Sequence, residues 1–225
     1  MADLEDVRRT RSSPPRDGSG PVSALVDDLD TVVAAAVAAL REVADRDWHV
    51  PARGLEWDCW ETVEHVADDL FAYAGQVAVR TPETSSYVPF AFTADRPGAP
   101  NLSVRAMADR GNVGLVQVLD ACGGFLSAVA RDADAERRGW HPWGVSDPGG
   151  FAAMGTVEVL LLVHDVAGPL GFGWDPDPDV VRRVLDRLFP DAPTHGDPWL
   201  TLLRATGRDP EVPVPEWRWD GSVRQ

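Results

Sequence analysis

The chain has 225 residues, of which 44% are hydrophobic and 25% are charged, and its formal net charge is −15. This is a globular composition, sufficient for one large domain or for a domain with a small appendage, and it excludes a wholly disordered chain. The acidic charge argues against nucleic acid and anionic membrane surfaces as partners, and because all 21 cationic residues are Arg, no lysine is available for a Schiff base or a P-loop.

The N-terminal segment predicts neither a secreted nor a membrane-anchored protein. Residues 1–20 carry Ser, Pro, Gly and charges of both signs without periodicity, which predicts a disordered tail rather than a signal peptide. The longest apolar stretch, 31–40, is much shorter than the ~20 residues that span a bilayer. Cys59 and Cys122 lie 63 positions apart and favour no disulfide. We therefore expect a cytoplasmic protein.

Two helices are predicted in the first third of the chain, where apolar residues recur at three- and four-residue intervals. The first covers about 23–48, with Ser23 as its N-cap. The second begins at Asp58 and Glu61, which have the spacing of a capping box, and ends before Thr81.

The segment 81–102 is rich in Pro, Ser and Thr and has no helical period, which predicts a long loop. Such loops are uncommon inside a compact domain, and they often cover a site. The alternative interpretation is a surface crossover between two helices.

Four more helices and a tail follow the loop. The segment 151–170 is the most apolar and should be the most buried, and the tail that carries Trp217 and Trp219 forms a short strand or packs on the helices. The glycines of the third helix predict a kink or the close approach of a neighbouring helix. Those glycines are Gly111, Gly114, Gly123 and Gly124, and the four helices cover about 103–132, 151–170, 178–189 and 198–206. The sequence therefore predicts an all-α fold, with a four-helix bundle over 21–172 and two short helices in a C-terminal extension, 173–225, packed on it.

Common catalytic motifs are absent from the sequence, which contains no GxGxxG, GxxxxGK[ST], HExxH or GxSxG. Cys59 has no histidine closer in sequence than His65, six positions further on, so a thiol nucleophile is not indicated.

His65 lies on the polar side of the second helix. At about 100° per residue it falls opposite the apolar stripe that starts at Val63, together with Glu61, Asp69, Ala72 and Gln76. Either this is a solvated acidic face, or it lines a wet pocket within the bundle.

The fourth helix combines an apolar sequence with Glu158, His164 and Asp165. Buried carboxylates are costly unless they are paired or bound to metal. Glu158 and Asp165 therefore have an Arg partner, face solvent or serve a functional site.

Three segments carry a resemblance to a known family: WETVEHVADDL, TVEVLLLVHDVAGPLG and LFPDAP…DPWLTLLRATGR. Together they resemble the DinB-like superfamily, and within it the mycothiol-dependent maleylpyruvate isomerase type, over about residues 22–207. The resemblance implies a four-helix bundle with a central divalent metal, zinc or nickel, which activates a mycothiol-like thiol for isomerisation or transfer.

In that family the metal ligands are a His on the second helix and a Glu-x-x-x-His pair on the fourth. Carried onto this chain, they fall on His65, Glu158 and Leu162, and Leu162 cannot ligate. A third ligand would have to come from His164 or from His141 in the loop 137–150. Asp165 is one turn beyond Leu162, and packing or capping is its expected role. Asp165 and His141 are also assigned to the pocket, together with Trp60 and Leu162.

Three functions remain open at this point. The first is a metal- and thiol-dependent isomerase or transferase whose third ligand is unconventional. The second is a metal-free bundle that binds a small molecule in a pocket lined by Trp60, His65, Glu158 and Leu162 and covered by 81–102. The third is a structural or oligomerising protein, and a homodimer would be compatible with any of them.

Overall fold

The computed structural model describes residues 21–212, 214 and 217–224, so the predicted tail 1–20 lies outside the described residues. Within this part of the chain the fold is all-α, and β-structure is limited to isolated bridges. The helices are α1 (Pro21–Glu42), α2 (Cys59–Ala78), α3 (Gly111–Asp132), α4 (Pro148–Leu170), α5 (Pro178–Leu188) and α6 (Pro198–Ala205), and a short 3-10 turn, η1 (Ala108–Arg110), precedes α3.

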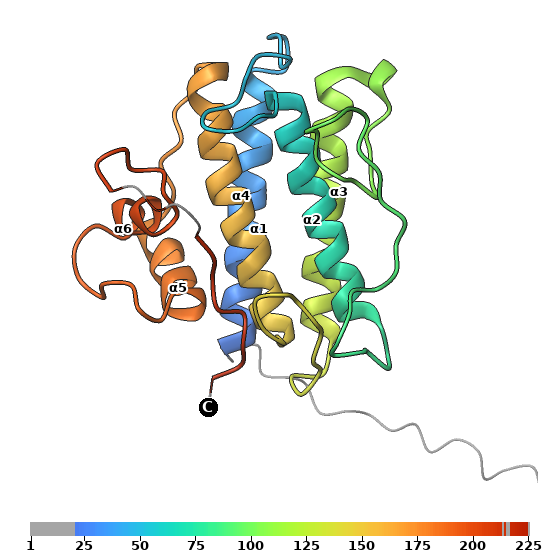
Figure 1. Ribbon diagram of the computed structural model, residues 1–225, viewed down its shortest axis with the longest axis vertical. Helices are drawn as coiled ribbons and strands as arrows, with labels where there is room; N and C mark the ends of the chain where they lie inside the picture. Colours follow the sequence, from blue (N-terminus) through green and yellow to red (C-terminus); the bar gives the residue numbers. More distant parts are fainter. Residues whose placement is uncertain (1–20, 213, 215–216, 225) are drawn as a thin grey trace, which may run out of the picture.

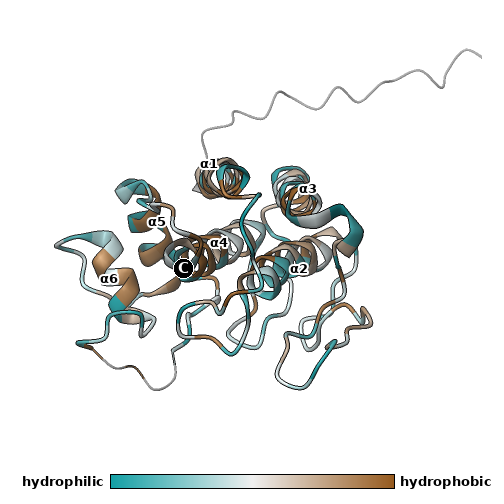
Figure 2. Ribbon diagram, turned by 90° about the horizontal axis from the view of Figure 1, so that it is seen from above, coloured by the Kyte–Doolittle hydropathy of each residue, from teal (hydrophilic) through white to brown (hydrophobic). Residues whose placement is uncertain are grey.

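Four long helices stand side by side, with α5 and α6 beside α4 on the side away from α3 (Figure 1). Seen from above, α1 and α2 occupy diagonal corners of a square whose other corners are α3 and α4, and α1 and α2 each pack against both α3 and α4 (Figure 2). The apolar stripes of the four helices meet in the middle, which confirms the predicted burial of 151–170.

Helices α2 and α3, which follow each other in the chain, run in the same direction (Figure 1). Arg131 near the end of α3 pairs with Asp27 near the start of α1 at 2.7 Å, while Asn112 at the start of α3 donates to the Ala44 carbonyl just after α1 at 3.0 Å. Helix α3 is therefore antiparallel to α1, and Figure 1 shows that it runs in the same direction as α2. The segment 79–107 has to travel back along the bundle between α2 and α3 (Figure 1).

Several helix ends differ from the sequence-based boundaries. Helix α1 begins at Pro21 and ends at Glu42, so Ser23 is not an N-cap. The capping box of Asp58 and Glu61 is confirmed, with the Glu61 amide donating to the Asp58 carboxylate at 2.7 Å.

The largest difference is at the start of the third helix, which begins at Gly111 rather than Ser103. The backbone amides of Ser103 and Val104 donate to the carboxylate of Asp68, each at 2.7 Å, and hold this stretch in a non-helical conformation. Asp68 thus takes up donors that a first helical turn would have left unpaired.

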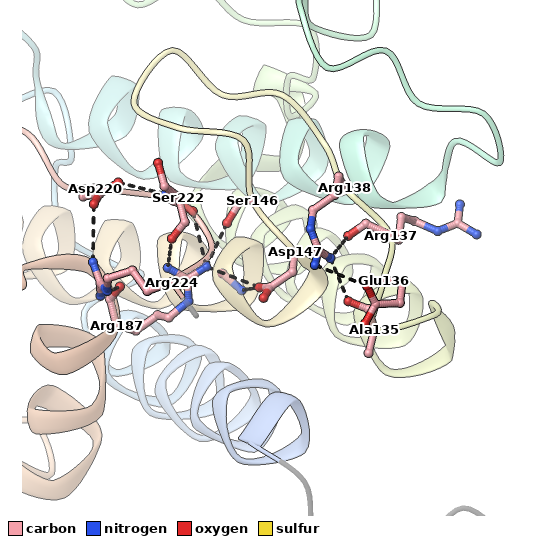
Figure 3. Close-up of polar contacts among 12 residues, drawn as sticks. Ala135, Glu136, Arg137, Arg138, Ser146, Asp147, Arg187, Asp220, Ser222 and Arg224 are labelled. Atoms are coloured by element: carbon pink, nitrogen blue, oxygen red, sulfur yellow. Dashed lines mark hydrogen bonds and ion pairs between the residues drawn. The ribbon is translucent and has the colours of Figure 1, made fainter.

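A C-terminal arm ties α5 to the loop that precedes α4. Arg187 on α5 reaches the Ser146 hydroxyl at 3.1 Å, the Asp147 carboxylate at 3.3 Å and the Ser222 carbonyl at 3.2 Å (Figure 3). Because one guanidinium joins both segments, the loop 140–147 and the arm 217–222 are held together. Of the two predicted alternatives for the tail, packing on the helices is the one observed, and Trp219 is buried.

Two helical segments are long and apolar enough to cross a membrane: α3 together with its preceding turn, and α4. Most of the apolar part of α4 is buried inside the molecule, whereas only 44% of the apolar part of α3 is buried. The core of a helical protein produces the same pattern as α4.

Gly123 allows α1 and α3 to approach closely. Close approach of a neighbouring helix was one of the two alternatives predicted for the glycines of the third helix. A Cβ atom at Gly123 would lie 2.7 Å from Cγ1 of Val33 on α1, whereas a Cβ at the adjacent Gly124 would meet nothing within 4 Å. The two neighbouring glycines therefore have opposite roles in packing.

We expect Gly123→Ala and Gly124→Ala to change stability in opposite directions. The first should destabilise the protein by about 1–3 kcal/mol through overpacking against Val33. The second should stabilise it by up to about 1 kcal/mol, because Ala is the better helix former. Urea unfolding of both variants measures this, and a loss of stability in Gly124→Ala as large as that in Gly123→Ala would contradict the assignment.

Candidate functional site

A cavity of about 450 Å³ lies on the side of the bundle where α2 and α4 meet, outside the apolar core. Its floor is the polar side of α2 and Glu158 of α4, and its walls come from three connections that are distant in sequence. These are the long segment between α2 and α3, the loop before α4 and the C-terminal arm, which contribute Tyr87, Phe90, His141, Trp143 and Trp219 among others.

The polar side of α2 lines this cavity along its length. Of the residues predicted on this face, His65, Asp69, Ala72 and Gln76 line the cavity. Glu61 does not, and it accepts a hydrogen bond from Arg96 at 2.8 Å instead. The pocket interpretation of this face is thus the one observed. The pocket lies between α2, α4 and the loops and not, as predicted, at the centre of the bundle.

Glu158 is the carboxylate through which α4 reaches the cavity. The other residues of α4 from 148 to 163 are buried, and Glu158 is partly exposed. The hydroxyl of Tyr73 on α2 donates to Glu158 Oε1 over 3.4 Å, a long hydrogen bond. His65 and Glu158, the two predicted residues from distant segments, therefore face one cavity.

Glu158 and Asp69 hold their protons more tightly than usual. Burial and, after it, the charge of Asp69 raise the pKa of Glu158 to about 8. Burial likewise raises the pKa of Asp69 well above its ordinary value, and the nearby Asp68 adds to this. Two carboxyl groups in a poorly hydrated space cannot both ionise at low cost, so the pair retains protons near neutral pH.

His65 has one nitrogen engaged and one free. Its Nε2 lies 3.3 Å from Asp69 Oδ2, while Nδ1 is buried and makes no hydrogen bond within the described residues. The indole of Trp57 packs edge-on against the imidazole, with ring centroids 4.7 Å apart. Burial lowers the pKa of His65 despite the nearby carboxyl groups.

His141 and the tryptophans form an aromatic wall. The His141 ring stacks on Trp219 with centroids 5.5 Å apart, and the indoles of Trp143 and Trp219 meet edge to face at 4.5 Å. Burial lowers the pKa of His141 to about 4, so its imidazole is neutral at pH 7. His141 is the second predicted histidine that lines the cavity.

The predicted loop 81–102 supplies the roof. Phe90 sits where Gly75 of α2 has no side chain, and a Cβ atom there would lie 2.5 Å from the Phe90 ring. At the other end of the loop, the Trp57 indole donates to the Gly98 carbonyl at 2.9 Å. The predicted covering role of this loop matches its position over the cavity.

Two predicted pocket residues lie elsewhere. Trp60 stacks on His49 with centroids 5.9 Å apart and does not line the cavity. Leu162, one turn beyond Glu158, is 5% exposed and belongs to the apolar core. The pocket assignments of Trp60 and Leu162 are therefore wrong.

His164 and Asp165 face a different part of the molecule. The His164 ring contacts Trp199 of α6 at 5.4 Å, so it cannot supply the missing metal ligand to His65 and Glu158. Asp165 is 2% exposed and forms a two-pronged ion pair with Arg208, at 3.0 and 2.7 Å. Asp165 thus has the structural role of an Arg-paired buried carboxylate and does not line the cavity.

Both cysteines are free and buried. Burial raises the pKa of Cys59 to about 12 and that of Cys122 to about 11, so neither thiol is activated as a nucleophile.

The donor groups of the cavity do not fit the resident metal that the resemblance implies. Within the described residues, no three His, Cys, Asp or Glu side chains are grouped so as to hold a metal ion. The third family position is the core residue Leu162, and Nδ1 of His141 accepts a hydrogen bond from the Trp143 amide at 3.2 Å. A catalytic zinc site needs three protein ligands, so we derive no reaction step through a metal.

The chain matches no family model, no curated protein and no solved structure.

The raised pKa of Glu158 has a consequence for stability. Since the folded-state pKa of about 8 exceeds the ordinary 4.5, its contribution is present below about pH 4.5 and is lost as the pH rises through 8. We expect Glu158→Gln to gain stability relative to the wild type between pH 6 and 9, by on the order of 2 kcal/mol at the alkaline end. Melting temperatures should then differ by roughly 4–8 °C.

The matched control for this experiment is Glu42→Gln, an exposed glutamate on α1. Its stability relative to the wild type should not change over the same pH range. A difference for Glu158→Gln that is equally flat would show that the Glu158 carboxyl titrates normally.

The Asp165–Arg208 pair gives a second prediction. Arg208→Leu leaves a buried carboxylate without its partner and should cost about 3–5 kcal/mol in urea unfolding. Replacing both residues by Leu should recover much of that loss. Arg131→Leu, which removes exposed ion pairs on α3, should cost less than about 1 kcal/mol. Equal losses in the two single variants would contradict the buried-pair assignment.

Proposed function

We propose that the protein is a DinB-like bundle of the mycothiol-dependent maleylpyruvate isomerase type that binds a small molecule, without a resident metal, in the cavity between α2 and α4. The observation that carries this proposal is that His65 and Glu158 line one cavity, under the loop expected to cover it. These are the two positions at which the sequence retains the family's site residues.

Three properties of the cavity support a binding role. Its volume of about 450 Å³ lies within the roughly 300–1,000 Å³ typical of small-molecule sites. It combines aromatic walls with a few polar groups, which is the usual composition of such sites. Its carboxyl groups have perturbed pKa values, and such groups are concentrated at functional sites.

A purely structural role fits these observations less well. Among the described residues no arginine pairs with Glu158, whereas Asp165 on the same helix is paired with Arg208. An unpaired carboxyl group on an apolar helix costs stability. A ligand that uses this group would account for its presence.

Blocking the cavity tests the proposal. Ala72 lines the cavity from α2, and Ala72→Phe should fill it without entering the core. We expect small aromatic fragments to raise the wild-type melting temperature by about 2 °C or more at concentrations well above Kd, and to have no effect on Ala72→Phe. The control is Ala128→Phe, at an exposed position on α3. Fragments that shift all three proteins equally, or a broad set that shifts none, would overturn the proposal.

A metal- and thiol-dependent isomerase or transferase is the competing function. It requires zinc or nickel to bind with one equivalent per chain and micromolar or tighter affinity, through His65 and Glu158. Calorimetric titration of Zn²⁺ and Ni²⁺ into the wild type and into His65→Ala distinguishes the two. Under our proposal, metal binding is weak and insensitive to the substitution. Tight binding that His65→Ala abolishes would instead favour the enzyme.

A further inference from the structure

The charged groups of the cavity are all acidic. Asp68, Asp69 and Glu158 line it, and no Arg is among its described lining residues in a chain that has no Lys. Burial lowers the pKa values of the two lining histidines, so at pH 7 neither adds a positive charge. An anionic ligand would find no counter-charge here.

The nearest basic group does not alter this conclusion. Arg208 influences Glu158 electrostatically, but its guanidinium is held by Asp165 at 2.7 Å and does not line the cavity. Asp68 in turn is satisfied by the amides of Ser103 and Val104. Asp69 and Glu158 are therefore the carboxyl groups left to meet a ligand.

Aromatic rings surround these two groups. The walls and roof include Tyr73, Tyr87, Phe90, Phe92, Trp143 and Trp219. Aromatic faces attract cations through the ring quadrupole, and the attraction grows when water is excluded. They also cover the apolar part of a ligand.

A separate observation concerns the buried polar atoms beside this cavity. Within the described residues, the buried side-chain polar atoms without a hydrogen-bond partner are His65 Nδ1 and Trp219 Nε1, and both side chains line this cavity. Trp219 is 4% exposed. Buried polar groups are normally paired, so two unpaired atoms beside one cavity indicate a polar ligand or its water.

Resting on the function proposed above, we propose that the ligand is an organic cation: a small protonated amine with an aromatic or aliphatic body. The ammonium group lies against Asp69 and Glu158, and the body lies against the tyrosines and tryptophans of the walls.

Three probes of similar shape and different charge test the inference: phenethylamine, phenethyl alcohol and phenylacetate. We expect phenethylamine to bind tightest at pH 8 in calorimetric titration, the alcohol to bind at least tenfold more weakly and phenylacetate not to bind. At this pH the ammonium group of phenethylamine is largely charged, as in lysine.

Variants locate the charge. Glu158→Gln should lower the affinity for phenethylamine at least tenfold, while the affinity for phenethyl alcohol stays within about twofold. Asp69→Asn provides a second variant should Glu158→Gln fold poorly, and it should weaken amine binding in the same selective way. Glu42→Gln should leave all three probes unaffected.

The outcomes separate this inference from the proposed function. If the alcohol binds in an Ala72→Phe-sensitive manner and the amine binds no better, the cavity is a ligand site but the inference is wrong. If phenylacetate binds best, the inference is also wrong. If none of the three binds and a wider fragment set also fails, both proposals are overturned.

Discussion

The two carboxyl groups of Asp69 and Glu158, brought from different helices into one poorly hydrated space, are the constraint from which the site follows. Burial raises the pKa of both groups, the charge of Asp69 raises that of Glu158 further, and the charge of Asp68 raises that of Asp69 further, so both are costly to ionise. The protein meets this cost at a place where α4 is otherwise apolar. We interpret Glu158 as part of the ligand site proposed above.

The contrast between Glu158 and Asp165 on the same helix supports this interpretation. Both are polar residues in an apolar sequence, and the sequence could not tell them apart. Asp165 is neutralised by Arg208, which also lies 5.3 Å from the Trp217 ring. Glu158 has only the long contact from Tyr73. One carboxylate thus fastens the C-terminal extension to the bundle, and the other remains available in the cavity.

The fold could be predicted from the sequence to a large extent, because helix periodicity and capping are local properties. The second helix, the long loop and the order of the helices agree with the structure. The start of α3 could not be predicted, because the amides of Ser103 and Val104 are held by Asp68, a partner 35 or more positions away. Periodicity carries no information about such a long-range contact.

The site was predictable only in part, for the same reason. The angular position of Asp69 and His65 on α2 could be read from the sequence. The presence of Glu158 in an apolar helical segment could also be read from it. The aromatic wall could not, since His141, Trp143 and Trp219 meet through a tertiary arrangement that Arg187 stabilises (Figure 3). Assigning Leu162 and Trp60 to the pocket assumed that the site lies at the bundle's centre, where the structure has close-packed apolar side chains.

The direction of α3 has an additional consequence. Because α2 and α3 run in the same direction, the segment 79–107 has to run back along the bundle between them. Part of this connection forms the roof of the cavity. The four-helix core and the roof are therefore separate parts of the structure. Substitutions at Tyr87, Phe90 or Phe92 change the lining of the cavity while the interior of the bundle stays as it is. In a fold of this kind the ligand preference of the cavity can change while the helical core is kept.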